Sequence, residues 1–136
     1  MQVSEVSTGD LPGLERDLPS EPAQVHRAHL RSAQTGTTTY LATWQHEQAL
    51  GTGVIRWAGP LGPQARSRYA DAPEIAHLQV GTQHRGQGVG SALVVAAETM
   101  IAARGHRFVA IGVGQDNPGA ARALSLANRV RPAHFP

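Results

Sequence analysis

Residues 78–93 read LQVGTQHRGQGVGSAL, in which three glycines stand at alternate positions. The residues that lead into them, Glu74–Val80, have the composition of a β-strand, and Ser91–Ala103 carries apolar residues at helical spacing. A glycine-rich loop between a strand and a helix allows backbone amides to converge on an anion, and the helix N-terminus adds positive partial charge. The stretch therefore predicts a pyrophosphate-binding loop, with a plain flexible turn as the alternative.

The chain after this helix predicts a second buried strand and a last helix. Residues 108–113 form a continuous apolar run, FVAIGV, which is typical of a strand covered on both faces. Together with Glu74–Val80 and the helix between them, this run makes a strand–helix–strand unit whose two strands are parallel. Asp116-Asn117-Pro118 then predicts the start of a last helix over 119–127.

The chain before this unit predicts a strand, two helices and a hairpin. Gln2–Val6 alternates like a short strand, and two short helices fit within residues 11–33. Residues 37–44 and 49–57 have the alternation of two hairpin strands, and residues 59–72 have the composition of a loop. The whole pattern predicts an α/β fold in which a mixed sheet carries helices on its faces.

Composition excludes several classes of function. All twelve basic residues are arginines, against ten acidic residues, and no short window is basic enough for a nucleic-acid-binding arm. The absence of cysteine excludes disulfides, thiolate metal sites and a cysteine nucleophile. The longest apolar run, Ala92–Ala97, is too short to span a bilayer, and the first residues lack an export signal. We expect one cytoplasmic domain over 1–136, with no metal, nucleic-acid or membrane partner.

The glycines also suggest dinucleotide binding, which is an alternative from another class. That fingerprint, G-x-G-x-x-G, needs a third glycine where this chain has Ser91. Its acidic residue, expected about 20 residues further on, would be Asp116, which lies 26 residues after Gly90. A dinucleotide domain needs two βαβαβ halves, whereas only 23 residues follow Val113. A small NAD-type nucleotide-binding protein is therefore kept as an alternative, although the chain departs from the fingerprint in these three ways.

Two motifs resemble those of the GNAT N-acetyltransferase superfamily. Arg85-x-x-Gly88-x-Gly90 resembles the R/Q-x-x-G-x-G/A acyl-CoA loop of that family, in its usual place between a strand and a helix. Asp116-Asn117-Pro118-Gly119-Ala120 resembles the N-x-x-A opening of the family's last helix. The resemblance covers residues 1–127 in order and spacing. It implies the GNAT-like order of strand, two helices, three strands, helix, strand and helix.

The resemblance implies transfer of an acetyl group from acetyl-CoA, a co-substrate, to an amine that no motif specifies. The backbone of Leu78, Gln79 and Val80 would bind the pantetheine arm. Asn117 would lie near the pantetheine, or would only cap its helix. The loop and the start of the next helix would hold the pyrophosphate through the backbone of Arg85, Gly86, Gln87, Gly88, Val89, Gly90 and Ser91.

The resemblance also implies a general base for the amine. In many members a Glu at the start of the strand before the loop takes the proton, and Glu74 stands at that place. Strict alternation along this strand would pack Glu74 against Ala76 and Leu78. His77 is the rival base, and the same alternation places it on the opposite face from Glu74. A solvated carboxylate and a structural histidine are the corresponding non-catalytic interpretations.

The chain departs from the family near its end. The family commonly has a Tyr seven residues after the Asn, as acid for the CoA thiolate, and this chain has Leu124 there. Too few residues follow the last predicted helix to form the hairpin that usually pairs with the strand over 108–113. We therefore expect an open edge on that strand and a homo-oligomer formed through it. These departures support a second interpretation, a non-catalytic acyl-CoA-binding or regulatory remnant of the same fold.

Overall fold

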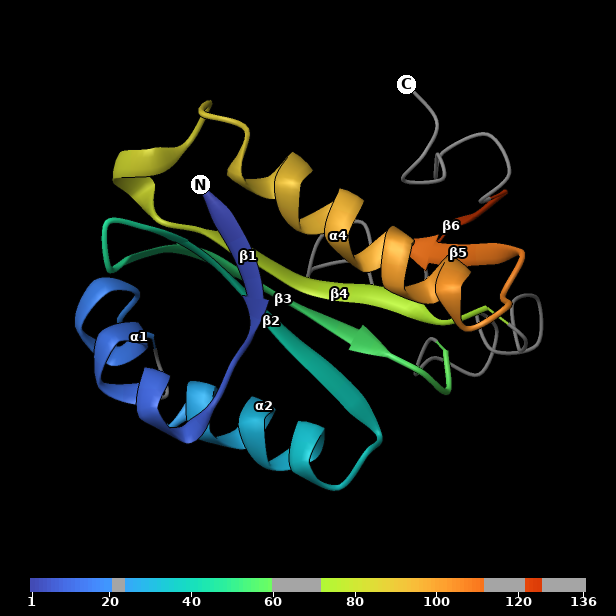
Figure 1. The fold of residues 1–136 in the computed structure, drawn as a ribbon, viewed down its shortest axis with the longest axis horizontal. Coiled ribbons are helices and arrows are strands. Elements are labelled where there is room, and N and C mark those ends of the chain that lie inside the picture. The colour runs from blue at the N-terminus through green and yellow to red at the C-terminus, as the bar shows by residue number, and fades with distance from the viewer. Residues whose placement is uncertain (21–23, 60–71, 112–121, 126–136) are drawn as a thin grey trace.

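The computed structural model describes residues 1–20, 24–59, 72–111 and 122–125. Within these ranges six strands form one mixed sheet whose order in space is their order in the sequence (Figure 1). All neighbouring strands are antiparallel except the fourth and fifth, which are parallel. The α/β class and the parallel strand–helix–strand unit predicted from the sequence are thereby confirmed.

The element bounds follow the sequence pattern closely as far as the fifth strand. The strands are β1 (Gln2–Glu5), β2 (Thr38–Gln45), β3 (Gln48–Arg56), β4 (Glu74–Val80), β5 (Phe108–Ile111) and β6 (Arg122–Ser125). The helices are α1 (Leu11–Asp17), α2 (Val25–Gln34) and α4 (Val89–Ala103), with 3-10 turns η1 (Thr8–Asp10) and η2 (Thr82–His84). Most of the predicted 59–72 loop and the end of the 108–113 run lie outside the described residues.

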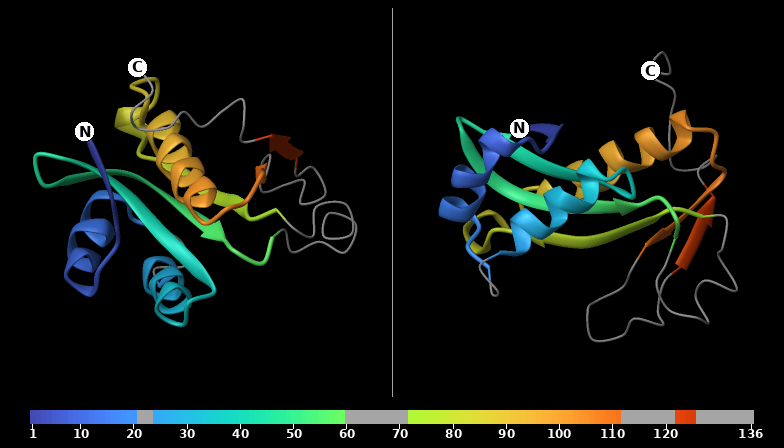
Figure 2. Two further views of the ribbon diagram at one scale, coloured as in Figure 1. Left: turned by 45° about the vertical axis from the view of Figure 1, so that its right-hand side comes forward. Right: turned by 90° about the horizontal axis from the view of Figure 1, so that it is seen from below.

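The sheet is covered on both faces. Helices α1 and α2 lie on one face, called here the α2 face, and helix α4 lies on the other, the α4 face (Figure 2). The core under α4 includes Leu41, Leu50, Ile55, Ile75, Val89, Leu93, Ala97, Ile101 and Val109. The core on the α2 face includes Val6, Leu14, Leu18, Leu30, Tyr40, Ala42, Ala49 and Val54. No helix in the described ranges has the length and hydropathy needed to cross a membrane.

Strand β4 contains a bulge that the alternation rule missed. Between the pairs Thr52↔Gln79 and Val54↔Ala76, β4 has one more residue than β3, and His77 adopts a left-handed φ of 52°. The extra residue exchanges the faces of all later side chains. Ile75 and Val80, five positions apart, therefore both pack on the α4 face.

Two predictions about this strand are consequently wrong. Leu78 does not pack beside Glu74; it lies on the α4 face, where it approaches Gly53 and Leu93. His77 is not on the opposite face from Glu74, because both side chains contact Arg56. Strict alternation fails here because the bulged residue interrupts the two-residue period.

The end of the chain also differs from the prediction. Residues 122–125, assigned to a helix over 119–127, form strand β6, which pairs antiparallel with β5 from Phe108↔Ser125 to Ile111↔Arg122. The edge of β5 is therefore occupied, and self-association through an open β5 edge loses its basis. Backbone pairing along that edge outweighs the helical propensity of an alanine-rich segment. β5 is also less buried than predicted, since Phe108 is 51% exposed.

Close packing of β3, β4 and α4 makes Gly51 a sensitive position. A Cβ at Gly51 would lie 2.7 Å from the Gln79 carbonyl oxygen and 2.8 Å from Val89 Cγ1. We expect Gly51→Ala to lower the free energy of unfolding by about 1–3 kcal/mol, measured by urea denaturation. Gly9→Ala is the control, because its Cβ would meet only Ser7 Oγ at 4.0 Å. Equal stability of the two variants would contradict this packing.

Candidate functional site

The glycine-rich loop connects η2 to the start of α4. Gly86 and Gly88 have φ values of 79° and 83°, a region that other residues rarely adopt, and Gly88 is the N-cap of α4. A Cβ at either glycine would meet nothing within 4 Å. The loop therefore exposes backbone on its outer side, where a ligand can approach closely.

The N-terminus of α4 supplies unpaired donors beside this loop. Its first helical hydrogen bond runs from the Ala92 amide to the Gly88 carbonyl, at 2.9 Å, so the three preceding amides have no partner inside the helix. The first turn contains no acidic residue, so no side-chain carboxylate competes for these amides. A fifteen-residue helix also directs the positive end of its dipole here. The arrangement suits an anionic group such as a phosphate.

A cavity of about 590 Å³ extends from this helix terminus along the α4 face. It brings together strand β4, the first three turns of α4 and the end of β5. Its lining, within the described ranges, is Leu78, Gly90, Ser91, Val94, Val95, Glu98 and Ile111. Leu78 and Val95 are partly exposed in it, at 39% and 61%, which gives the cavity apolar walls open to solvent.

The cavity unites only some of the residues predicted from the sequence. Leu78, Gly90 and Ser91 line it directly, whereas the Arg85 and Gln87 side chains are exposed on the loop nearby. Gln79 and Val80 follow Leu78 in β4, and no described strand pairs with β4 beside them on the β5 side. The Val89 side chain is buried in the core, so only its backbone can contact a ligand. Asn117 lies outside the described residues.

Glu98 was missed by the sequence analysis. Its side chain lines the cavity although the residue is only 3% exposed, which is unusual for a carboxylate on a core-facing position of a helix. The spacing of residues 91, 94, 95 and 98 could have indicated it, because these positions share one face of a helix.

Glu74 lies at the start of β4 on the α2 face. The residue is 6% exposed, and its Oε1 accepts a hydrogen bond of 2.7 Å from Nη1 of Arg56. Glu74 pairs with Ala110 of β5 and Ile75 with Ile111, and the Ala110 amide donates to the Pro73 carbonyl at 2.8 Å. Glu74 is therefore the first of the two β4 residues registered with β5 in the described ranges, one residue before that pairing stops.

His77 is held beside this ion pair. Its Nε2 lies 2.6 Å from Nη2 of Arg56, and because arginine only donates, Nε2 is the acceptor. Burial, followed by the Arg56 guanidinium, lowers the pKa of His77, and the Glu74 carboxylate opposes this. The imidazole is therefore neutral and its Nε2 lone pair is engaged, which weakens His77 as the rival base.

Three further polar residues continue this cluster into α2 and β2. The His29 ring lies 4.9 Å from that of His77 and 5.1 Å from that of Tyr40, between ring centroids. Burial lowers the pKa of His29 to about 4, with His77, His26 and Arg56 contributing. Burial raises the pKa of Tyr40 to about 12. The described residues contain no group of three potential metal ligands, so these histidines are not arranged around a metal site.

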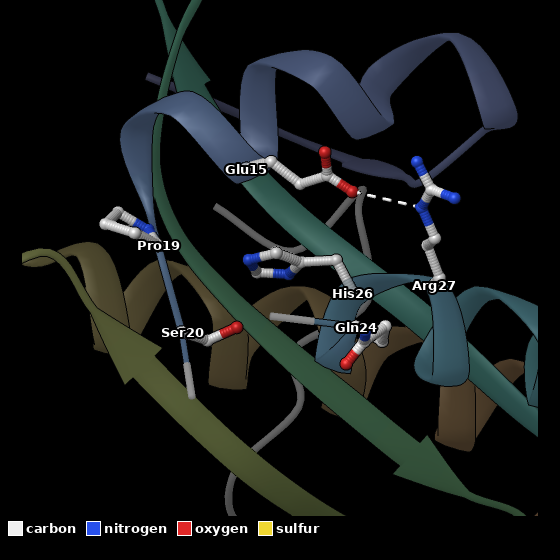
Figure 3. A pocket seen from close by; sticks show the side chains of 6 residues that line it. All are labelled: Glu15, Pro19, Ser20, Gln24, His26 and Arg27. Atoms are coloured by element: carbon white, nitrogen blue, oxygen red, sulfur yellow. Dashed lines mark hydrogen bonds and ion pairs between the residues drawn. The ribbon is translucent and has the colours of Figure 1, made fainter. Parts of the chain in front are cut away.

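A second cavity, of about 370 Å³, lies between α1 and α2 (Figure 3). Glu15 and Arg27 form an ion pair of 3.2 Å across it. His26, which also lines it, uses both ring nitrogens, one with the Tyr40 hydroxyl at 2.6 Å and one with the Leu18 carbonyl at 2.7 Å. Its charged side chains are paired with each other and both imidazole nitrogens of His26 are engaged, so the described lining of the cavity offers no free ionisable group for a reaction.

Comparisons of sequence and structure agree with this geometry. The sequence profile described as the acetyltransferase (GNAT) family matches residues 6–126. Among curated proteins none matches the sequence at a significant level. Solved structures do match, and their identities below 25% show likeness of fold alone.

Three of these structures illustrate the likeness. A GNAT family acetyltransferase from Brucella melitensis in complex with acetyl-CoA has a TM-score of 0.62 at 13% identity, covering 91% of this chain and 86% of that one. AAC(6')-Iy in complex with the bisubstrate analogue CoA-S-monomethyl-acetylneamine has a TM-score of 0.66 at 16% identity, covering 85% of this chain and 81% of that one. A ribosomal-protein-alanine N-acetyltransferase from Brucella melitensis has a TM-score of 0.60 at 18% identity, covering 86% of this chain and 76% of that one. With its profile match spanning most of the sequence, this chain belongs to the GNAT acetyltransferase family.

Proposed function

We propose that the protein transfers an acetyl group from acetyl-CoA to an amine. The observation that carries the proposal is the open, left-handed glycine loop at the N-terminus of α4, adjoining a cavity along β4. A long acyl thioester with a pyrophosphate at one end matches this combination of an anion site and an apolar channel. The Brucella melitensis relative bound to acetyl-CoA supports the choice of ligand.

The proposed binding mode divides the ligand between β4 and the loop. The backbone groups of Leu78, Gln79 and Val80 bind the pantetheine arm, as an added strand would. The amides of the loop and of the first helical turn, from Arg85 to Ser91, bind the pyrophosphate. Asn117 contacts the pantetheine from the chain beyond β5.

In the proposed reaction Glu74 takes the proton of the acceptor ammonium group. Arg56 occupies Oε1, which leaves Oε2 to receive the proton. The neutral amine then attacks the thioester carbonyl carbon, the tetrahedral intermediate collapses as the C–S bond breaks, and the nitrogen loses its second proton to water. The products are the acetylated amine and CoA thiolate.

The thiolate can leave without a protein acid. A thiol has a pKa of about 8.5, so the released thiolate takes a proton from water at moderate cost. The chain has Leu124, not Tyr, seven residues after Asn117. This same observation favours the second candidate function, a protein of this fold that binds acyl-CoA without transferring the acyl group.

The loop assignment predicts that Gly88→Asp abolishes acetyl-CoA binding in calorimetry. The new side chain would stand in the open space above the loop and bring a negative charge to the pyrophosphate site. Gly105→Asp is the matched control, because Gly105 also has a left-handed φ, 89°, with nothing near its Cβ, at the far end of α4. The assignment is wrong if both variants bind like the wild type.

The base assignment predicts that Glu74→Gln lowers turnover by roughly 10²- to 10⁴-fold and leaves acetyl-CoA affinity nearly unchanged. Release of CoA over a panel of amines is the measurement. Glu15→Gln is the control, since Glu15 is also paired with an arginine, in the other cavity. A Glu74→Gln enzyme that keeps more than half its rate at pH 7 and pH 9 contradicts the role.

Acetyl-CoA binding with no CoA release from any amine would favour the non-catalytic function. Binding of NAD in place of acetyl-CoA would favour the dinucleotide alternative instead. Titrations with acetyl-CoA and with NAD, together with the CoA-release assay, therefore separate all three candidate functions.

A further inference from the structure

A continuous chain of side-chain contacts leads from Glu74 into helix α2. Glu74 is bonded to Arg56 at 2.7 Å, and Arg56 is bonded to His77 at 2.6 Å. The His77 ring lies against His29 of α2, which lies against Tyr40 of β2. The carboxylate itself is bonded to Arg56, and the chain behind Arg56 draws on His77 of β4, His29 of α2 and Tyr40 of β2.

The central member of this chain, His77, has a left-handed backbone conformation. Its φ of 52° lies in a region that few non-glycine residues adopt, histidine being among those enriched there. Residues held in such regions concentrate at functional sites, where the surroundings compensate for the strain. Here the left-handed turn places the imidazole on the Glu74 side of the sheet, within reach of Arg56.

In both hydrogen bonds of this chain Arg56 is the donor. Arg56 donates with Nη1 to the carboxylate and with Nη2 to the imidazole, so two acceptors fix the plane of one guanidinium. Without the second acceptor the guanidinium retains one bond and is free to turn about it. The Glu74 carboxylate is then bonded to a guanidinium that can rotate, so its own orientation is no longer fixed.

We propose that His77 is a positioning residue for Glu74 and acts through Arg56. It holds the guanidinium in the plane that leaves Oε2 of Glu74 directed to the acceptor amine. The imidazole itself takes no proton in the reaction. This inference rests on the proposed function, because it assumes that Glu74 is the base.

Three variants isolate this role. His77→Gly keeps the left-handed backbone and removes the acceptor, while His77→Gln is long enough to place its amide oxygen Oε1 where Nε2 accepts the bond from Arg56. His46→Gly is the matched control. His46 has a φ of 51°, nearly that of His77, and lies exposed in the turn between β2 and β3.

The kinetic test uses the amine with the highest rate in the panel. We expect His77→Gly to lower kcat by roughly 10- to 100-fold, because small misplacement of a reacting group costs up to about 10² in rate, with the amine KM within twofold. His77→Gln should recover most of the loss and His46→Gly should match the wild type. Full activity of His77→Gly overturns the inference, as does an equal loss in His77→Gln.

A second readout does not need activity. In ¹⁵N NMR of the arginine side chains, assigned with Arg56→Gln, we expect resolved Arg56 Nη signals in the wild type and His77→Gln. In His77→Gly the two signals should merge as the group rotates. Identical signals in all three proteins overturn the inference.

This readout separates the inference from the function on which it rests. If no amine is acetylated, or if Glu74→Gln is fully active, the proposed function or its base fails. The Arg56 signals then decide alone whether His77 fixes the Arg56–Glu74 pair.

Discussion

The single extra residue in β4 is the constraint on which the candidate site depends. Without it, Glu74, Leu78 and Val80 would all lie on one face of the sheet. With it, Glu74 lies on the α2 face, while Leu78 and Val80 turn to the α4 face. One strand therefore presents a carboxylate to one side and an apolar wall to the other, within seven residues.

This division separates the two halves of the proposed reaction. On the α4 face the cavity, the helix terminus and the glycine loop offer an apolar channel that ends in anion donors. On the α2 face the arginine, the imidazoles and the carboxylate form a polar cluster supported by α2. A thioester bound on one side and an amine arriving from the other would meet at the strand between them. The bulge links the two sides, because it turns Leu78 and Val80 to the α4 face and brings His77 into contact with Arg56.

The sequence predicted most of the fold because local signals were strong. The ends of β4 are marked by Pro73 and Gly81, and its predicted bounds, Glu74–Val80, agree with the structure. The loop and α4 followed from the glycine spacing and the helical period, within two residues at the helix start. These elements owe their form to residues close in sequence.

The errors arose where distant contacts decide the structure. Residues 122–125 belong to an alanine-rich stretch, 119–127, whose composition favours a helix, yet they pair with β5, which is distant from the local signals that the prediction used. No glycine marks the bulge at His77 in the sequence. The side chains that contact His77 come from Arg56 and His29, which lie 21 and 48 residues before it in the chain. The glycine loop at the start of α4 could be placed from sequence, but the polar cluster around Glu74 could not.

The central claim is that acetyl-CoA binds along β4 and at the N-terminus of α4. Titration of ¹⁵N-labelled protein with acetyl-CoA, followed through backbone amide signals, tests it residue by residue. We predict saturable shifts at Leu78–Val80 and Arg85–Ser91, with none at the cavity between α1 and α2. Saturable shifts confined to that other cavity, or no shifts at all, would contradict the account.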